Sequence, residues 1–224
     1  MKDAIYSVFF AIYHKFIGRK HIHFSIRSKL DFHTKLEGYN KIGANSAILN
    51  SVVGRGTYIG WNSILSNGQI GRFCTIAPFV ECIVGTHPLY PFVSIHPAFY
   101  SLQKQAGFTF VSRQKFREYI LVDNKYNFII GNDVWIGRDV KIFGGITIGD
   151  GAIVATGSIV TKDIPPFEVW GGSPAKKIKD RFPDEIKGVL IDLRWWEWEF
   201  DELQNNSEYF DDIDSFIKRF KNKG

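Results

Sequence analysis

The chain carries a hydrophobic repeat with a period of six residues. In its second half every sixth position is a β-branched aliphatic residue, and the position four beyond each is small or apolar. The repeated aliphatic positions are Ile130, Ile136, Ile142, Ile148, Val154 and Val160. This period does not match an α-helix, and so many consecutive repeats predict a solenoid of short strands.

The same period appears, less regularly, in the first half of the chain, where two steps are shortened to five residues. The aliphatic series there is Leu30, Leu36, Ile42, Ile48, Val53, Ile59, Leu65, Ile70, Ile76 and Cys82. Small residues fill the intermediate slot, at Ser46, Thr57, Ser63 and Cys74. We expect a triangular prism in which each hexapeptide supplies one flat strand and one corner. Backbone hydrogen bonds would join coils stacked roughly 4.8 Å apart.

The repeat is interrupted once and then replaced by a helical pattern. We predict a helical N-terminal segment over residues 1–23 and a β-helix domain over 24–182. An excursion loop at 86–128 interrupts that domain, and a helical tail follows over 183–224. A loop of about forty residues in a compact solenoid is more often functional than accidental.

Composition and charge narrow the class of protein. The 224 residues are 45% hydrophobic and 23% charged, which predicts an ordinary globular protein. The net charge of +5 suits a phosphorylated ligand, but there is no long basic run that would indicate nucleic acid. Cys74 and Cys82 lie in an apolar stretch and are expected in the core of a cytosolic protein.

An apolar segment at residues 5–17 is too short to span a membrane and contains His14 and Lys15. It is either a helix packed on the body of the protein or an interfacial helix at the inner membrane. We therefore expect a cytoplasmic protein, with peripheral membrane contact as the alternative.

His87 opens the excursion loop, just as the chain leaves the predicted prism. An imidazole on a rigid mount suits a general base, because its ordinary pKa is about 6.5. The alternatives are a surface or packing histidine, or a metal ligand. The spacing of His and Cys residues matches no zinc pattern, so no metal site is predicted.

Three segments resemble a known family. Residues 85–88 (GTHP), after Ile76-Ala77-Pro78, are similar to the segment with the catalytic histidine in galactoside and maltose O-acetyltransferases. Residues 94–101 (SIHPAFYS) resemble polysaccharide O-acetyltransferases, and residues 193–198 (LRWWEW) resemble the tail of xenobiotic acetyltransferases. The resemblance, over about residues 40–200, is to hexapeptide-repeat acetyltransferases. It implies an all-β fold, a left-handed parallel β-helix, with a homotrimeric assembly and His87 as the base.

The later coils are similar to the stretch that holds acetyl-CoA in that family. The resemblance implies that Trp135 walls the groove and that Thr156, Gly157 and Thr161 face the pantetheine amides. Lysines would face the phosphates. The full implied set is Trp135, Gly137, Thr156, Gly157, Thr161, Lys162, Lys176 and Lys179. The alternatives are a plain turn at 171–174 and solvated lysines on a helix face. Arg138 stands where the family usually has a small polar residue.

The sequence motifs give less information about the residues that bind the acceptor than about those that bind acetyl-CoA. We expect His96, Tyr100 and Asn67 to contact the acceptor, with packing as the alternative for His96. The tail either covers its own prism or reaches the neighbouring subunit.

We predict an acetyl-CoA-dependent O-acetyltransferase whose acceptor is a sugar hydroxyl of a bacterial surface polysaccharide or its precursor. The hydroxyl, deprotonated by His87, would attack the thioester carbonyl of acetyl-CoA directly. The alternatives are a streptogramin or chloramphenicol O-acetyltransferase, an amino-sugar N-acetyltransferase, and a non-enzymatic β-helix scaffold.

Overall fold

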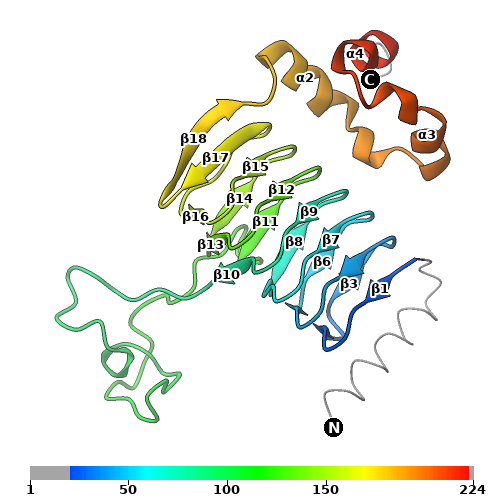
Figure 1. The fold of residues 1–224 in the computed structure, drawn as a ribbon. Coiled ribbons are helices and arrows are strands. Elements are labelled where there is room, and N and C mark those ends of the chain that lie inside the picture. The colour runs from blue at the N-terminus through cyan, green and yellow to red at the C-terminus, as the bar shows by residue number, and fades with distance from the viewer. Residues whose placement is uncertain (1–20, 222–224) are drawn as a thin grey trace.

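The computed structural model describes residues 21–221, so the predicted helical segment at 1–23 and its membrane contact lie almost wholly outside the described residues. The described chain winds into a parallel β-solenoid with three flat faces, here called A, B and C (Figure 1). The predicted β-helix of hexapeptide repeats with a helical tail is confirmed.

Each turn of the chain adds one short strand to each face. Face A contains β1 (His23–Phe24), β4 (Lys41–Ile42), β7 (Tyr58–Ile59), β9 (Thr75–Ile76), β12 (Trp135–Ile136), β15 (Ile153–Val154) and β17 (Glu168–Gly172), and then antiparallel β18 (Ala175–Asp180). Face B contains β2 (Lys29–Leu30), β5 (Ala47–Ile48), a bridge at Ile64, β10 (Glu81–Ile83), β13 (Lys141–Phe143) and β16 (Ile159–Val160). Face C contains β3 (Lys35–Leu36), β6 (Val52–Val53), β8 (Gly68–Ile70), β11 (Phe128–Ile130), β14 (Ile146–Ile148) and a bridge at Ile164.

The six-residue repeat explains this core. All six aliphatic positions from Ile130 to Val160 are buried, as is the earlier series from Leu36 to Cys82. Neighbouring coils align these side chains, because Ile59 pairs with Ile76 and Ile136 pairs with Val154. Equivalent positions of the repeat therefore stack along the prism, and each coil buries the apolar side chains of the next.

Small polar residues occupy the slots between the aliphatic ones and bond to the next coil. Ser46 donates to the Gly60 carbonyl oxygen at 2.8 Å, and Thr57 donates to that of Gly71 at 2.7 Å. Cys74 fills the same slot. Burial raises the pKa of the Cys74 and Cys82 thiols to about 12, so both are neutral core residues, as predicted.

The excursion leaves the solenoid at the edge between faces B and C, the BC edge, and returns without disturbing the stack (Figure 1). Strand β11 pairs with β8 below and β14 above, while β10 pairs with β13. The returning chain is held by the Asn127 amide, which donates to the Asn67 carbonyl oxygen at 2.7 Å. The prism is therefore a rigid mount for both ends of the loop.

The helical tail packs along the edge between faces A and C, the AC edge. It contains α2 (Asp184–Leu193), η2 (Trp195–Glu197), α3 (Phe200–Asn205), η3 (Ser207–Tyr209) and α4 (Ile213–Phe220). Trp195 contacts Phe73, and Phe200 stacks on Tyr39, 4.0 Å between ring centroids. These contacts show the tail covering its own prism, the first of the two alternatives. No helix within residues 21–221 is long and apolar enough to cross a membrane.

Arg55 is the polar link between the prism and this tail. Its guanidinium donates to the Trp196 carbonyl oxygen at 3.3 Å and to that of Trp198, and lies 3.8 Å from Glu199. We expect Arg55→Met to cost about 2 to 4 kcal/mol, because it strands two carbonyl groups under the tail. Urea unfolding and proteolysis of the tail measure this effect.

Arg113→Met is the matched control, because Arg113 is an exposed arginine of the loop. We expect it to change the free energy of unfolding by less than about 0.5 kcal/mol. Equal stability of the two variants would show that Arg55 does not hold the tail.

Candidate functional site

His87 is exposed at the BC edge and is held from behind by two oxygen atoms. Its Nδ1 lies 3.0 Å from the carbonyl oxygen of Ile95 and 2.6 Å from the hydroxyl of Tyr100. The Ile95 carbonyl oxygen can only accept a hydrogen bond, and the Tyr100 hydroxyl can also accept one, so the tautomer with its proton on Nδ1 satisfies both contacts. The Nε2 lone pair is then free, and an exposed Nε2 can accept a proton from a bound hydroxyl group.

Tyr100 lies behind His87. The side chain is fully buried, and its ring meets the imidazole edge-to-face. Burial first, and then the negative charge of Glu118, raise the pKa of Tyr100, so the phenol keeps its proton at neutral pH. The buried Tyr100 side chain turns its hydroxyl to His87, and its contact with an acceptor stays a prediction.

Glu118 is the centre of a hydrogen-bond network beneath this pair, and its carboxylate is buried. Ser101 donates to it at 2.5 Å, Gln105 at 2.5 Å and Gln114 at 2.8 Å. Within the described residues it forms no ion pair, so three neutral donors replace a counter-charge. Its carbonyl oxygen also accepts from the Thr86 amide at 2.8 Å, which ties the network to the residue before His87.

Sequence reasoning missed Glu118. The loop has no periodicity, so nothing in the sequence indicates that this carboxylate folds back beneath the entry of the loop. Its charge alone would place it at the surface.

His96 and Asn67 have local structural contacts. His96 accepts from the Ala98 amide at 3.2 Å, caps the short helix η1 (Pro97–Phe99), and stacks on Phe108. Asn67 donates to the Lys125 carbonyl oxygen at 3.1 Å and so braces the return of the loop. Both lie on the loop or at the edge it leaves, but neither contacts His87 directly in the structure.

The predicted acetyl-CoA residues are divided between two edges of the prism. Thr161 and Lys162 lie at the BC edge, the edge of His87, in a later coil. Gly137, Thr156 and Gly157 lie at the edge between faces A and B, the AB edge, beside the exposed Trp135 of β12. A single prism does not bring these two edges together.

The predicted lysines differ in their contacts. Lys176 and Lys179 lie on β18, a strand and not the helix face considered above. Their neighbour Lys177 is paired with Glu168 and Asp180, each at 2.8 Å. Lys162, Lys176 and Lys179 are exposed and form no ion pair within residues 21–221, so their ammonium groups are available to an anion.

The two predicted glycines also differ. A side chain at Gly157 would meet nothing within 4 Å, so the backbone there is open to close approach by a ligand. A Cβ at Gly137 would lie 2.5 Å from the Thr156 nitrogen of the next coil. The structure thus gives Gly137 a packing requirement.

We expect Gly137→Ala to destabilise the prism by about 1 to 3 kcal/mol, because two backbones must separate. Gly188→Ala is the control of opposite sign. Gly188 lies within α2 with open space around it, so alanine should stabilise the protein by about 0.5 to 1 kcal/mol. Urea unfolding of both variants measures the difference, and equal effects would contradict the packing argument.

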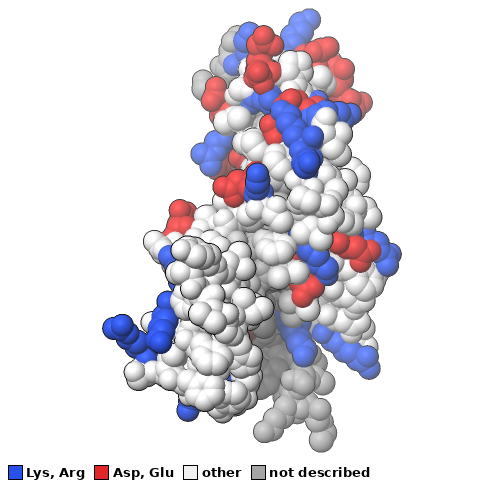
Figure 2. Space-filling view, turned by 90° about the vertical axis from the view of Figure 1, so that its left-hand side faces the viewer, with Lys and Arg blue, Asp and Glu red and all other residues white. Residues whose placement is uncertain are grey.

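The surface around His87 is formed by the excursion loop. Figure 2 shows this lobe as largely uncharged, with basic residues at its margin. Leu89, Tyr90, Val93 and Phe110 are highly exposed there. Among the described residues, no cluster of three His, Cys, Asp or Glu side chains could hold a metal ion.

Comparison with known proteins agrees with this architecture. Residues 128–162 match the family described as hexapeptide repeat of succinyl-transferase. The chain is 37% identical over 137 residues to a chloramphenicol acetyltransferase of Klebsiella aerogenes, covering 60% of this chain and 61% of that protein. A probable macrolide acetyltransferase of Lysinibacillus sphaericus is 44% identical over 80 residues, which are 36% of this chain and 44% of that protein.

Among solved structures, a variant of GDP-perosamine N-acetyltransferase from Caulobacter crescentus aligns with a TM-score of 0.49 and 17% identity, over 75% of this chain and 65% of that chain. The chain spans about 61% of the length of the chloramphenicol acetyltransferase. The chain therefore has a hexapeptide repeat that matches this family over residues 128–162 and winds into a solenoid, and its sequence is similar to those of acetyltransferases.

Proposed function

We propose that the protein is an acetyl-CoA-dependent O-acetyltransferase with His87 as general base. The observation that carries the proposal is the exposed imidazole whose Nδ1 faces a carbonyl oxygen at 3.0 Å, which leaves Nε2 as a proton acceptor. The acetyltransferase relatives support the reaction class.

The reaction is a direct transfer. Nε2 of His87 takes the proton of the acceptor hydroxyl as its oxygen attacks the thioester carbonyl carbon. The carbon–sulfur bond then breaks, the ester is released, and the thiolate of coenzyme A recovers the proton from the imidazolium. An acyl-enzyme is not part of the proposal, because burial keeps Cys74 and Cys82 neutral.

The residues predicted for acetyl-CoA fit such a donor. Lys162, Lys176 and Lys179 are exposed and unpaired within the described chain, as contacts to phosphates require. Gly157 leaves open space for an extended arm, and Trp135 offers an exposed ring beside it.

The division of these residues supports a site shared between copies of the chain in a homotrimer. His87 lies at the BC edge, while Trp135 and Gly157 belong to face A and the AB edge. The BC edge of one copy and the AB edge of another would form the groove together. Thr156 is exposed at the same AB edge, so mixing inactive His87→Asn and Thr156→Trp subunits by unfolding and refolding should restore part of the activity. No restoration from correctly assembled mixtures would place the whole site within one chain.

For the acceptor we propose a sugar hydroxyl of a bacterial surface polysaccharide or its precursor. The support is the segment at 94–101 that resembles polysaccharide O-acetyltransferases, together with the broad exposed loop surface beside His87. An exposed surface suits a large acceptor better than a small enclosed one. The protein would then act in the cytoplasm, on a carbohydrate partner.

A second candidate is a xenobiotic O-acetyltransferase, favoured by the relatives named for chloramphenicol and macrolides. Thiol release from acetyl-CoA should be measured with two acceptor panels, one of nucleotide-linked sugars and oligosaccharides and one of chloramphenicol and streptogramin A. Transfer to a sugar supports the first candidate, and efficient transfer to an antibiotic replaces it with the second. If acetyl-CoA binds but no acceptor of either panel causes thiol release, both proposed acceptor classes are contradicted.

A further inference from the structure

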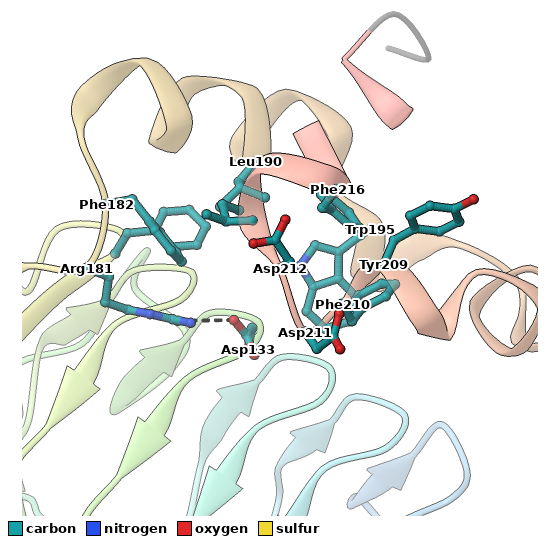
Figure 3. A pocket seen from close by; sticks show the side chains of 12 residues that line it. Asp133, Arg181, Phe182, Leu190, Trp195, Tyr209, Phe210, Asp211, Asp212 and Phe216 are labelled. Carbon is teal, nitrogen blue, oxygen red and sulfur yellow. Dashed lines mark hydrogen bonds and ion pairs between the residues drawn. The ribbon is translucent and has the colours of Figure 1, made fainter. Parts of the chain in front are cut away.

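A cavity of about 530 Å³ lies between the helical tail and the AC edge of the prism (Figure 3). Its lining comes from the prism corner at Asp133, from the segment after β18, and from α2, η2, η3 and α4. The cavity lies at the AC edge, whereas His87 lies at the BC edge, where the chain leaves the prism. The cavity is therefore separate from the site around His87. Its volume is typical of a small-molecule site.

The walls of the cavity are largely aromatic. Phe182, Trp195, Phe210 and Phe216 supply rings, and Leu190 adds an aliphatic surface. Trp195 and Phe210 meet edge-to-face, with 5.2 Å between their centroids, and Phe210 meets Phe216 at 5.0 Å. Rings fixed in this way hold a preformed apolar surface, and ring faces also attract cations.

The one arginine of the lining is already committed. Arg181 donates to Asp133 at 3.1 Å and to the Gly151 carbonyl oxygen at 2.6 Å, and its guanidinium lies over the Phe182 ring. Its charge is therefore balanced by Asp133, and its geometry is set by the prism corner. An anion would have to displace these contacts in order to bind it.

Two further carboxylates line the cavity without a counter-charge. Asp211 and Asp212 form no ion pair within the part of the chain that the structure describes. Asp212 caps α4 by accepting from the Ser215 amide at 2.7 Å, so its position is fixed. Figure 3 shows Asp212 and Asp133 on facing sides of a space that has Arg181 at one end and Trp195 at the other.

We propose that this cavity binds an organic cation with an apolar body, a protonated or quaternary amine. The ammonium group faces Asp212 and Asp211, and the apolar body lies against Trp195 and Phe182. The charge of the lining, three aspartates against one arginine already paired, favours a cation over an anion. Aromatic rings beside carboxylates are the usual surroundings of a bound quaternary ammonium.

The test uses benzyltrimethylammonium with the full-length protein in isothermal titration calorimetry. This probe has no hydroxyl or amine hydrogen, so it cannot be an acetyl acceptor, and the result is independent of the proposed function. We expect saturable binding of one probe per chain, weakened as ionic strength rises. Benzenesulfonate, an anion with a similar ring, should not bind.

Asp212→Asn removes the charge and keeps a side-chain oxygen that can cap α4. We expect it to weaken binding of the probe about tenfold, as loss of one charge-assisted contact does. Asp214→Asn is the matched control, because Asp214 is exposed in the first turn of α4 and does not line the cavity. It should leave binding unchanged.

Three results would overturn the proposal. They are the absence of saturable binding by the cation, equal binding of benzenesulfonate, or the same affinity in the Asp212 and Asp214 variants. Thermal unfolding of each variant, measured alongside, shows whether the tail remains folded. A second variant, Trp195→Leu, should also weaken binding if the rings contribute. Acetyl transfer by Asp212→Asn should be unaffected.

Discussion

His87→Asn is expected to lower the rate of acetyl transfer by about 10² to 10⁴-fold, the usual contribution of a general base. Asparagine keeps a side-chain nitrogen near the Ile95 carbonyl oxygen, 3.0 Å from Nδ1 in the native chain. The asparagine amide is too weak a base to take a proton from a hydroxyl group at neutral pH. The loss should therefore fall on kcat and leave the folded structure intact. Single-turnover thiol release and thermal unfolding measure both quantities.

His33→Asn is the matched control for this variant. His33 is an exposed histidine at the same BC edge, in the first coil of the prism and far along the chain from the loop. We expect its rate of transfer to equal that of the wild type. If His87→Asn retained full turnover, the assignment of the base would be wrong.

Glu118→Leu is expected to destabilise the protein by about 2 to 4 kcal/mol, because the neutral donors beneath the loop lose their acceptor and that of Ser101 is buried. Leucine fills the volume but accepts no hydrogen bond, so the donors from Ser101, Gln105 and Gln114 lose their acceptor. The loop behind His87 should loosen before the prism does. Amide hydrogen exchange, read separately for the loop and the prism, should show this order, and urea unfolding gives the total.

Two further variants sharpen the test of Glu118. Glu118→Gln keeps one acceptor oxygen but replaces the other with an NH₂ donor. Its loss in the free energy of unfolding should therefore lie between zero and the loss for Glu118→Leu. Glu208→Leu, at an exposed glutamate of the tail, should change stability by less than about 0.5 kcal/mol. Exchange in the loop that stays as slow as in the prism would contradict the role given to Glu118.

Much of the fold could be predicted because the repeat is a local rule. Each hexapeptide has the same requirement, an aliphatic side chain pointing inward and a small residue at the corner. The pattern therefore identified core residues such as Ile136 and Val154 individually, and both are fully buried. The helical spacing after Pro183 predicted the tail for the same reason.

The candidate site could be predicted only in part. His87 stood out because it follows a recognisable coil, and Lys162 and Lys176 because they stand in a family-like stretch. The burial of Tyr100 behind His87 and the network at Glu118 were not predictable. They join residues 13 and 17 positions apart in a segment without any period.

The sequence by itself determined the solenoid, its core and the place where the chain leaves it, because these depend on contacts that recur from coil to coil. The tertiary structure alone decided where the non-repeating parts settle. It placed the tail along its own AC edge through Arg55 and Phe73, and it set His87 and Trp135 on different parts of the prism. Such contacts join segments far apart in the chain, and their geometry depends on side-chain packing that no local pattern encodes.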